Sequence, residues 1–286
     1  MAGISTCFAK RVDALAFPRR KHAGMNAIHR VLDPRKGDRI PDGFCALAVM
    51  TKAPQAGRVK TRLTPPLSSE EAAALNVCFL RDSAAAISRT ANKKKALGIA
   101  VYTPVGMEAA YTGILPEAFQ LVPQRGDAFG DRLAAATEDL LQLGFTSLCL
   151  IDSDSPTVPD VAFSQAVDFL ASDDDSVVLG PSDDGGYYLI GLKKLHRRLF
   201  ERIDWSTDRV LEQTIAAARE IGLSVHLLQT WYDVDDRATL SRLCHEFFAS
   251  NGNAGGRSAA PATRQFLDEL LEREGRSRIW PNESQS

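Results

Sequence analysis

The sequence predicts a single-domain α/β fold built on a mostly parallel, doubly wound sheet. Short apolar runs alternate with longer segments of helical period along most of the chain, a pattern typical of parallel strands covered by helices. With 286 residues, 44% of them hydrophobic, the chain is long enough to bury a full core. In such folds ligands bind beyond the carboxyl ends of the strands, so the loops that follow strands are the places to look for a site.

The first strand is expected at 44–50, which is apolar throughout, and the helical-period segment 68–89 follows it. The later elements continue the same alternation. They are strand 97–102, helix 127–143, strand 147–151, helix 160–170, strands 176–180 and 187–192, helix 208–221, strand 224–228 and helix 236–249.

The two ends of the chain lie outside this pattern, so the folded domain is expected at 43–249. Residues 1–42 have no sustained period and are interpreted as a flexible basic arm, because residues 1–40 carry nine Lys and Arg against three Asp. The remaining body is acidic, which argues against a nucleic-acid partner. Residues 250–286 are interpreted as a flexible linker and a short charged helix at about 262–274.

Cysteine use and hydropathy favour a cytoplasmic protein. The five cysteines are scattered, odd in number and never spaced as Cys-x-x-Cys, so neither a disulfide framework nor a zinc site is indicated. No stretch approaches the roughly 18 apolar residues that a membrane span requires. The sequence does not indicate an oligomeric state.

A basic loop follows the first strand at 51–63. It carries four cations, the turn-forming Gly57 and the hydroxyl of Thr61. Backbone N–H groups, Lys52, Lys60 and Arg62 could cradle phosphates there. The order of residues is not that of a Walker A loop. A solvated basic loop without a ligand is the alternative.

An acidic run, Asp-Ser-Asp-Ser-Pro, follows the apolar strand 147–151. Asp152 and Asp154 are one residue apart, so their carboxylates could bind one Mg²⁺ or Mn²⁺ that bridges the phosphates of a nucleotide. The alternative is that this run only caps the next helix. Asp160 could do that capping itself, which would leave the earlier pair free.

Two further loops carry carboxylates. In 180–188, Gly185 and Gly186 allow a ligand to approach the backbone closely beside Asp184, although an Asp-Gly hairpin turn would explain the same residues. In 231–236, Asp233 and Asp235 alternate and can face one side of an extended segment. Either a second metal ligand or a base could come from this loop, and a helix N-cap is the alternative.

Taken together, these loops resemble one bacterial family, the radical-SAM/selenodomain-associated transferases or arsenosugar-biosynthesis glycosyltransferases. The resemblance covers about 44–248 and rests on strings that occur in order. They are Lys-Ala-Pro-x-x-Gly-x-Val-Lys-Thr-Arg-Leu from residue 52, Gly-Asp-Ala-Phe-Gly-Asp-Arg-Leu at 126–133, Asp-Ser-Pro at 154–156, Gly-Pro-Ser-Asp-Asp-Gly-Gly-Tyr-Tyr-Leu-Ile-Gly-Leu at 180–192, Trp-Ser-Thr at 205–207 and Asp-Val-Asp at 233–235.

The resemblance implies a GT-A-like fold of the nucleotide-diphosphosugar transferase superfamily. It also implies that Lys52, Lys60 and Arg62 hold nucleotide phosphates, that Asp154 is the main metal ligand, and that Asp235 is a second ligand. The sequence departs from the family pattern at Asp152, where the family more often has Gly.

The resemblance places two further segments near the ligands. Gly126, Asp127 and Arg132 would lie near the base, ribose or phosphate, whereas the alternative is a Gly-rich helix entrance capped by Asp127. Gly185, Gly186, Tyr187 and the Trp205-Ser206-Thr207 string would line the acceptor pocket. Ser206 and Thr207 could instead cap the following helix.

The function expected from this set is metal-dependent transfer of a sugar from a nucleotide-diphosphate sugar to a small-molecule acceptor, with Asp184 or Asp233 as catalytic base. The first alternative is a nucleotidyltransferase, similar to a guanylyltransferase, that uses a nucleoside triphosphate and releases pyrophosphate. The second is a nucleotide-binding protein without catalysis.

Overall fold

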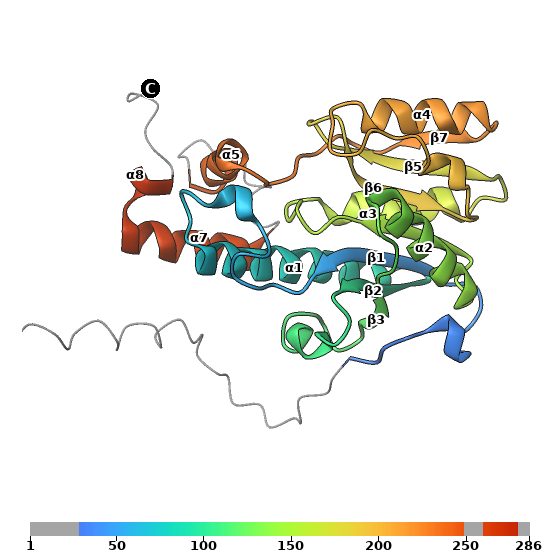
Figure 1. Cartoon of the computed structure of the whole chain (residues 1–286), viewed down its shortest axis with the longest axis horizontal. Coiled ribbons are helices and arrows are strands. Elements are labelled where there is room, and N and C mark those ends of the chain that lie inside the picture. The colour runs from blue at the N-terminus through green and yellow to red at the C-terminus, as the bar shows by residue number, and fades with distance from the viewer. Residues whose placement is uncertain (1–28, 249–259, 280–286) are drawn as a thin grey trace, which may run out of the picture.

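A seven-stranded sheet forms the centre of the molecule in a computed structural model that describes residues 29–248 and 260–279 (Figure 1). All strand pairs are parallel except those of β6 with β4 and β5. The single-domain, mostly parallel α/β fold is therefore confirmed. In sheet order the strands are β3 (Gln120–Pro123), β2 (Ala96–Thr103), β1 (Cys45–Lys52), β4 (Ser147–Ile151), β6 (Tyr187–Leu192), β5 (Ser176–Pro181) and β7 (Ser224–Leu227).

The order of the strands creates a crevice between β1 and β4. From β1 the chain builds outward through β2 to β3, and then returns to the other side of β1 to form β4. The loops after β1 and β4 therefore leave the same edge in opposite directions, which is where ligands bind in doubly wound folds. Because β6 is antiparallel, its first residues lie at this edge as well.

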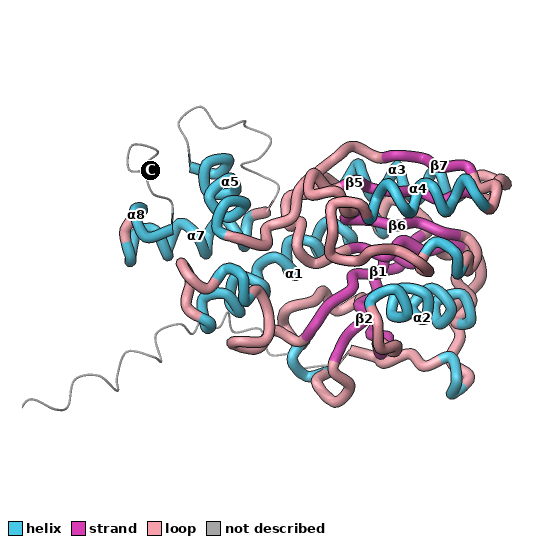
Figure 2. Tube along the Cα trace, turned by 45° about the horizontal axis from the view of Figure 1, so that its top comes forward, coloured by secondary structure: helices cyan, strands magenta, loops and turns pink. Residues whose placement is uncertain are grey.

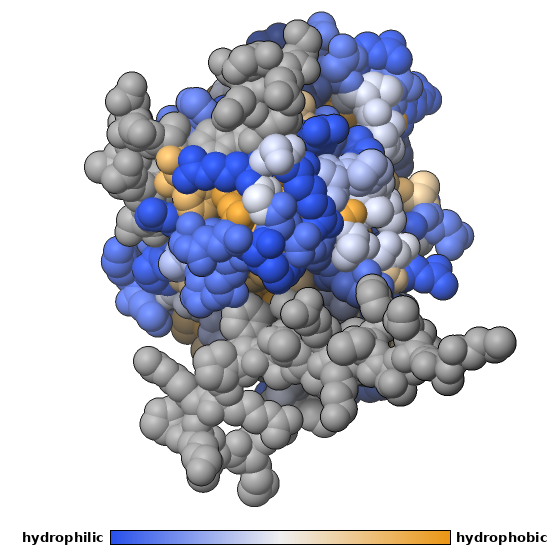
Figure 3. Space-filling view, turned by 90° about the vertical axis from the view of Figure 1, so that its left-hand side faces the viewer, coloured by the Kyte–Doolittle hydropathy of each residue, from blue (hydrophilic) through white to orange (hydrophobic). Residues whose placement is uncertain are grey.

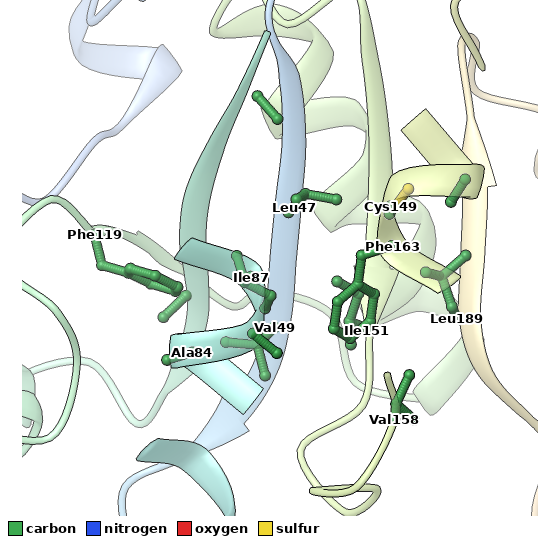
Figure 4. Packing of buried hydrophobic residues seen from close by; sticks show 14 of the residues in the cluster. Leu47, Val49, Ala84, Ile87, Phe119, Cys149, Ile151, Val158, Phe163 and Leu189 are labelled. Atoms are coloured by element: carbon green, nitrogen blue, oxygen red, sulfur yellow. The ribbon is translucent and has the colours of Figure 1, made fainter. Parts of the chain in front are cut away.

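Helices cover both faces of the sheet (Figure 1). The helices α1 (Ser69–Ala91) and α3 (Asp160–Leu170) bury one face, where Leu47 and Val49 of β1 meet Ile87 and Phe163 (Figure 4). On the other face, α2 (Phe129–Gln142) and α4 (Val210–Glu220) pack in a second cluster, which includes Ala46 and Ala48 of β1. A strand buried on both faces needs a continuous apolar run, which is why β1 could be predicted from the sequence.

A third hydrophobic core lies beyond the sheet and is built by helices α5 (Arg237–Phe248), α7 (Pro261–Glu274) and α8 (Arg276–Ile279) around the first half of α1 (Figures 1 and 2). The outer face of this end is largely hydrophilic (Figure 3). Leu63 and Leu67 from the loop after β1, and Tyr232 and Val234 from the loop after β7, belong to the same core. The helix expected at 262–274 is thus present as α7, where it is a packed part of the fold.

Polar contacts fix α7 and α8 onto α1. The buried carboxylate of Asp82 accepts hydrogen bonds from the N–H groups of Ala262 and Thr263, at 3.0 and 2.8 Å, at the start of α7. Arg278 pairs with Glu71 at 2.6 Å and donates to the carbonyl of Pro66 at 3.2 Å. Glu71 also accepts from the N–H of Ser68, the N-cap of α1, so one carboxylate joins three segments.

The prediction of a flexible arm at 1–42 is partly wrong, because residues 29–42 are folded onto the domain. Leu32 is fully buried, and its N–H donates to the carbonyl of Leu121 in β3 at 2.8 Å. A short 3-10 helix, Pro34–Lys36, follows and is capped by Asp33. Residues 1–28 and the linker 249–259 lie outside the described residues, so the rest of both expectations is not addressed. Among the described helices, none combines the length and apolar character that crossing a membrane requires.

Candidate functional site

Two adjoining cavities open at the carboxyl edge of the sheet, one of about 230 Å³ and one of about 520 Å³. They share the side chains of Arg62, Ser153, Asp154 and Asp235. We call the smaller one the cationic cavity and the larger one the aromatic cavity, after the residues that line them. A molecule with a diphosphate and a second group could therefore reach from one cavity into the other.

The cationic cavity is formed mainly by the loop after β1. Lys52, Arg58, Lys60, Thr61 and Arg62 line it. Gly57 has a φ of 71°, which lets the chain turn before these residues, but it does not itself line the cavity. Lys60 takes a left-handed conformation with φ of 48° just before the 3-10 helix Thr61–Leu63. Four of the predicted phosphate-binding residues, Lys52, Lys60, Thr61 and Arg62, therefore line one cavity. The fifth, Gly57, only forms the turn that precedes Lys60.

Lys60 lies between two of the three carboxylates that were predicted as metal ligands, Asp154 and Asp235. Its Nζ is 2.8 Å from Oδ1 of Asp154 and 2.9 Å from Oδ1 of Asp235, and it also donates to the carbonyl of Val234 at 2.8 Å. Arg62 pairs with the other oxygen of Asp235. Loops after β1, β4 and β7 therefore meet at one ammonium group.

The electrostatics of this cluster follow from its burial and its opposite charges. Burial lowers the pKa of Lys60, but the carboxylates of Asp154 and Asp235 outweigh burial and hold that pKa above its usual value. Burial likewise raises the pKa of Asp235, and the positive charges of Lys60 and Arg62 outweigh it, so the net shift is downward. The cluster is a paired, charged network at neutral pH.

Asp152 is directed into its own loop, which differs from its predicted role beside Asp154. One oxygen accepts from the N–H groups of Asp154 and Ser155 at 3.3 Å, and the other accepts from the hydroxyl of Ser155 at 2.9 Å. Burial and the neighbouring charge of Asp154 raise the pKa of Asp152 well above its usual value. Asp152 therefore caps this turn, and Asp160, which was expected to cap, instead pairs with Arg89 of α1 at 2.6 Å.

The aromatic cavity contains the predicted acceptor-binding residues other than Gly185. Trp205 makes edge-to-face contacts with Phe129, at 5.0 Å between ring centroids, and with Tyr187, at 6.5 Å. Phe129 lines the cavity, and about half of its surface remains exposed. It was not predicted as a site residue, because only Gly126, Asp127 and Arg132 were predicted from the glycine-rich string. Gly186, Ser206, Thr207 and Asp208 complete this wall of the cavity.

Close backbone packing brings these loops together at Gly185. Its φ is 90°, and a Cβ there would lie 2.1 Å from the carbonyl oxygen of Asp208. Its own carbonyl accepts from the N–H of Leu211 at 2.8 Å. Gly185 thus fastens the loop after β5 to the start of α4, although it does not line the cavity. Thr207 accepts from the N–H of Arg209 at 3.3 Å and donates to the carbonyl of Asp204, so its hydroxyl orders the turn before α4. Arg209 is the N-cap of α4, and its side chain does not cap the helix.

Two candidate bases face the aromatic cavity. Asp184 is exposed, and one of its oxygens accepts from the N–H of Gly186 at 2.9 Å, which leaves the other oxygen without that constraint. Asp233 accepts from the hydroxyl of Ser182 at 3.2 Å. Burial, together with the charges of Asp184 and Asp235, raises the pKa of Asp233 to about 6.

The glycine-rich segment 126–132 does not reach either cavity with the residues predicted for it. Gly126 and Asp127 are exposed, and Arg132 donates back to the carbonyls of these two residues at 3.4 and 2.9 Å. Neither cavity is lined by any of the three. The string is therefore a helix entrance, but Ala128 rather than Asp127 is the N-cap of α2, and its N–H donates to Asp131. Phe129 and Leu133 from the same string line the aromatic cavity.

Sequence comparison gives a partial family match. Residues 86–207 match a family described as uncharacterized proteins conserved in bacteria, DUF2064. Comparison with curated proteins gives no match.

Comparison with solved structures gives a stronger similarity. A protein of Desulfovibrio desulfuricans described as a candidate nucleotide-diphospho-sugar transferase is 27% identical, with a TM-score of 0.70 over 81% of this chain and 97% of that chain. Rv0371c of Mycobacterium tuberculosis, in a complex with manganese, is 15% identical, with a TM-score of 0.43 over 71% and 98%. A CMP:2-keto-3-deoxy-manno-octonic acid synthetase complexed with CTP is 9% identical, with a TM-score of 0.46 over 70% and 97%.

The first of these similarities covers nearly the whole of the other chain. The GT-A-like fold and the prediction of a transferase enzyme are therefore confirmed at this level.

Proposed function

We propose that the protein is a metal-dependent glycosyltransferase that moves a sugar from a nucleotide-diphosphate sugar to a small-molecule acceptor. The observation that carries this proposal is the junction of the two cavities at Asp154, Asp235 and Arg62. A cationic cavity suits a diphosphate, and an aromatic cavity with carboxylates suits a hydroxylated molecule. The resemblance to arsenosugar-biosynthesis glycosyltransferases supports a sugar as the group transferred.

The residues of the cationic cavity would hold the leaving diphosphate. Lys52, Lys60 and Arg62 provide fixed positive charge where negative charge develops as the glycosidic bond to phosphate breaks. Lys60 is held in place by two carboxylates and a backbone carbonyl, so little reorganisation is required. This prior ordering is the main electrostatic contribution that the chain itself offers.

Asp154 and Asp235 fit a hard divalent cation. Both line the two cavities with side chains that are 36% and 27% exposed, and carboxylate oxygens are the donors that Mg²⁺ and Mn²⁺ prefer. Within residues 29–248 and 260–279 no group of three or more His, Cys, Asp or Glu side chains could hold a metal ion, so phosphate and water would provide the other ligands. A bound cation would neutralise the diphosphate.

Asp184 is proposed as the base that removes the proton from the acceptor. It lies in the aromatic cavity near the junction and can reach a ligand that stacks against Trp205 and Phe129. Asp233 is the second candidate, because its raised pKa of about 6 suits proton exchange near neutral pH. Holding both substrates across the junction would lower the barrier further by orientation.

The proposal is tested by supplying UDP- or GDP-sugars, or nucleoside triphosphates, with Mg²⁺ or Mn²⁺ and identifying the product that leaves. Nucleoside diphosphate released from a sugar nucleotide supports glycosyl transfer. Pyrophosphate released from a triphosphate, without diphosphate from any sugar nucleotide, would show a nucleotidyltransferase instead. Tight binding of nucleotides without turnover would show a binding protein. Asp154→Asn serves as the inactive control in every assay.

A further inference from the structure

Asn76 in the middle of α1 lines the cationic cavity, and no feature of the sequence indicated it. Only 5% of the residue is exposed. Its carboxamide oxygen is fully buried and has no hydrogen-bond partner among the described residues. A polar group in this state costs folding free energy, because it has lost its bonds to water without gaining others.

The position of Asn76 on the helix explains why its side chain meets the site. Phe79 lies three residues further along α1 and so shares its face of the helix, and the Nζ of Lys60 lies 5.1 Å from the centre of the Phe79 ring. The neighbouring residues Leu75 and Phe79 are fully buried in the third hydrophobic core. An apolar residue would therefore fit the surroundings of position 76 without the cost that the carboxamide carries.

The other residues of the cavity indicate the kind of group that would complete Asn76. Lys52, Arg58, Lys60 and Arg62 line the same space, so an anion is favoured over a neutral or cationic ligand. A carboxamide carries two N–H donors as well as its acceptor oxygen, and half a turn about its last bond exchanges their places. It can therefore donate to a phosphate oxygen.

We propose that Asn76 is a nucleotide-binding residue whose carboxamide donates a hydrogen bond to the diphosphate in the cationic cavity. This inference rests on the proposed function, because it takes the anion to be the diphosphate of a nucleotide. Asn76 adds a neutral, directional donor to a cavity in which four cations provide the positive charge.

The test compares Asn76→Leu with the matched control Gln120→Leu. Gln120 in β3 also has a buried carboxamide oxygen without a partner among the described residues, but it lines neither cavity. Nucleoside diphosphate and inorganic pyrophosphate are titrated separately by calorimetry, each with Mg²⁺. Thermal unfolding of each variant is measured without ligand.

For Asn76→Leu we expect the Kd of both compounds to rise at least about tenfold, the loss typical of one hydrogen bond to a charged group. The unfolding temperature without ligand should stay the same or rise, because the unpaired carboxamide is gone. Gln120→Leu should leave both Kd values unchanged. Asn76→Asp should weaken binding further than Asn76→Leu at pH 7, since it places a negative charge beside the phosphates, and it keeps the test open should the Leu variant not fold.

Three outcomes would overturn the inference. Wild-type affinity for both compounds in the Asn76 variants would show that the residue does not contact the ligand. A weakening seen with nucleoside diphosphate but not with pyrophosphate would place the contact on the ribose or base. Wild-type protein that binds neither compound would overturn the proposed function, and this inference with it.

Discussion

The ammonium of Lys60 lies 2.9 Å from Oδ1 of Asp235, a residue 175 positions later in the chain. Asp154 binds the same ammonium from a third loop at 2.8 Å. The side chain of Lys60 is only 4% exposed, whereas those of Asp154 and Asp235 are 36% and 27% exposed. One cation therefore holds three loops of the site together.

Replacing Lys60 by Met should destabilise the protein at pH 7. The change leaves Asp154 and Asp235 near each other without the cation between them, and Arg62 compensates only one of them. We expect a loss of about 1–3 kcal/mol in the free energy of unfolding, the typical cost of leaving a buried polar group unpaired. Urea unfolding at pH 7 measures it. A Lys60→Met variant as stable as wild type would contradict the central position of this cation.

The stability difference between wild type and Lys60→Met should depend on pH. The folded-state pKa of Asp235 lies below its unfolded value, so its stabilising contribution is present above about pH 4 and is lost as pH falls through the folded pKa. The folded-state pKa of Lys60 is raised, so its contribution is present below about pH 10 and is lost at higher pH. Urea unfolding from pH 3 to 8 should show the difference shrinking below pH 4. A constant difference across this range would contradict the pairing.

Asp152 and Asp154 should differ in metal binding although they are one residue apart. Asp154→Asn should raise the Kd of Mn²⁺, measured by paramagnetic resonance with nucleoside diphosphate present, at least about tenfold. Asp152→Asn should bind Mn²⁺ nearly as well as wild type, because the oxygens of Asp152 face its own turn. Equal losses in the two variants would show that Asp152 is a ligand as well.

Asp184→Asn should lower kcat for glycosyl transfer at least about 100-fold with little change in folding, if Asp184 removes the acceptor proton. Asp183→Asn is the matched control, because Asp183 is equally exposed but pairs with Arg242 outside both cavities. A large loss in Asp233→Asn with a small loss in Asp184→Asn would instead assign the base to Asp233. Steady-state rates and circular dichroism of all three variants decide this.

Arg278 should stabilise the loop 60–68 although it lies in α8, outside both cavities. Arg278→Met removes the contacts to Glu71 and to the carbonyl of Pro66, so we expect a loss of about 1–2 kcal/mol in stability. Hydrogen exchange of residues 60–68 should become faster, and nucleotide affinity should fall. Glu272→Gln, on the exposed face of α7, is the control. Unchanged exchange in 60–68 would show that the C-terminal helices do not position this loop.

Apolar runs predicted the buried strands well because a strand covered on both faces must be apolar along its covered part, as 45–50 of β1 and 148–151 of β4 are. The short edge strand β3 was missed, since four residues ending in Pro123 leave little pattern. The ordered segment at 29–42 was also missed. It is held by Leu32 and by backbone pairing with β3, which composition does not show.

The site was predictable to the extent that its residues follow strands. Lys52, Lys60, Arg62, Asp154 and Asp235 were found this way because the carboxyl ends of parallel strands meet at one edge. Asp152 accepts hydrogen bonds from its own turn, which a sequence does not show, and its assignment as a metal ligand stays a prediction. Asn76 was not found because one polar residue in the middle of a helix carries no local signal.

The third hydrophobic core also determines when, during translation, the loops of the site can pack. The strands that carry the site emerge from the ribosome well before residues 261–279, yet Leu63, Leu67 and Val234 bury their side chains against the helices those residues form. A nascent chain that has completed its sheet therefore still lacks the packing that holds the loops of Lys60 and Asp235. It follows that the cationic cavity takes its final shape only after α7 and α8 have docked.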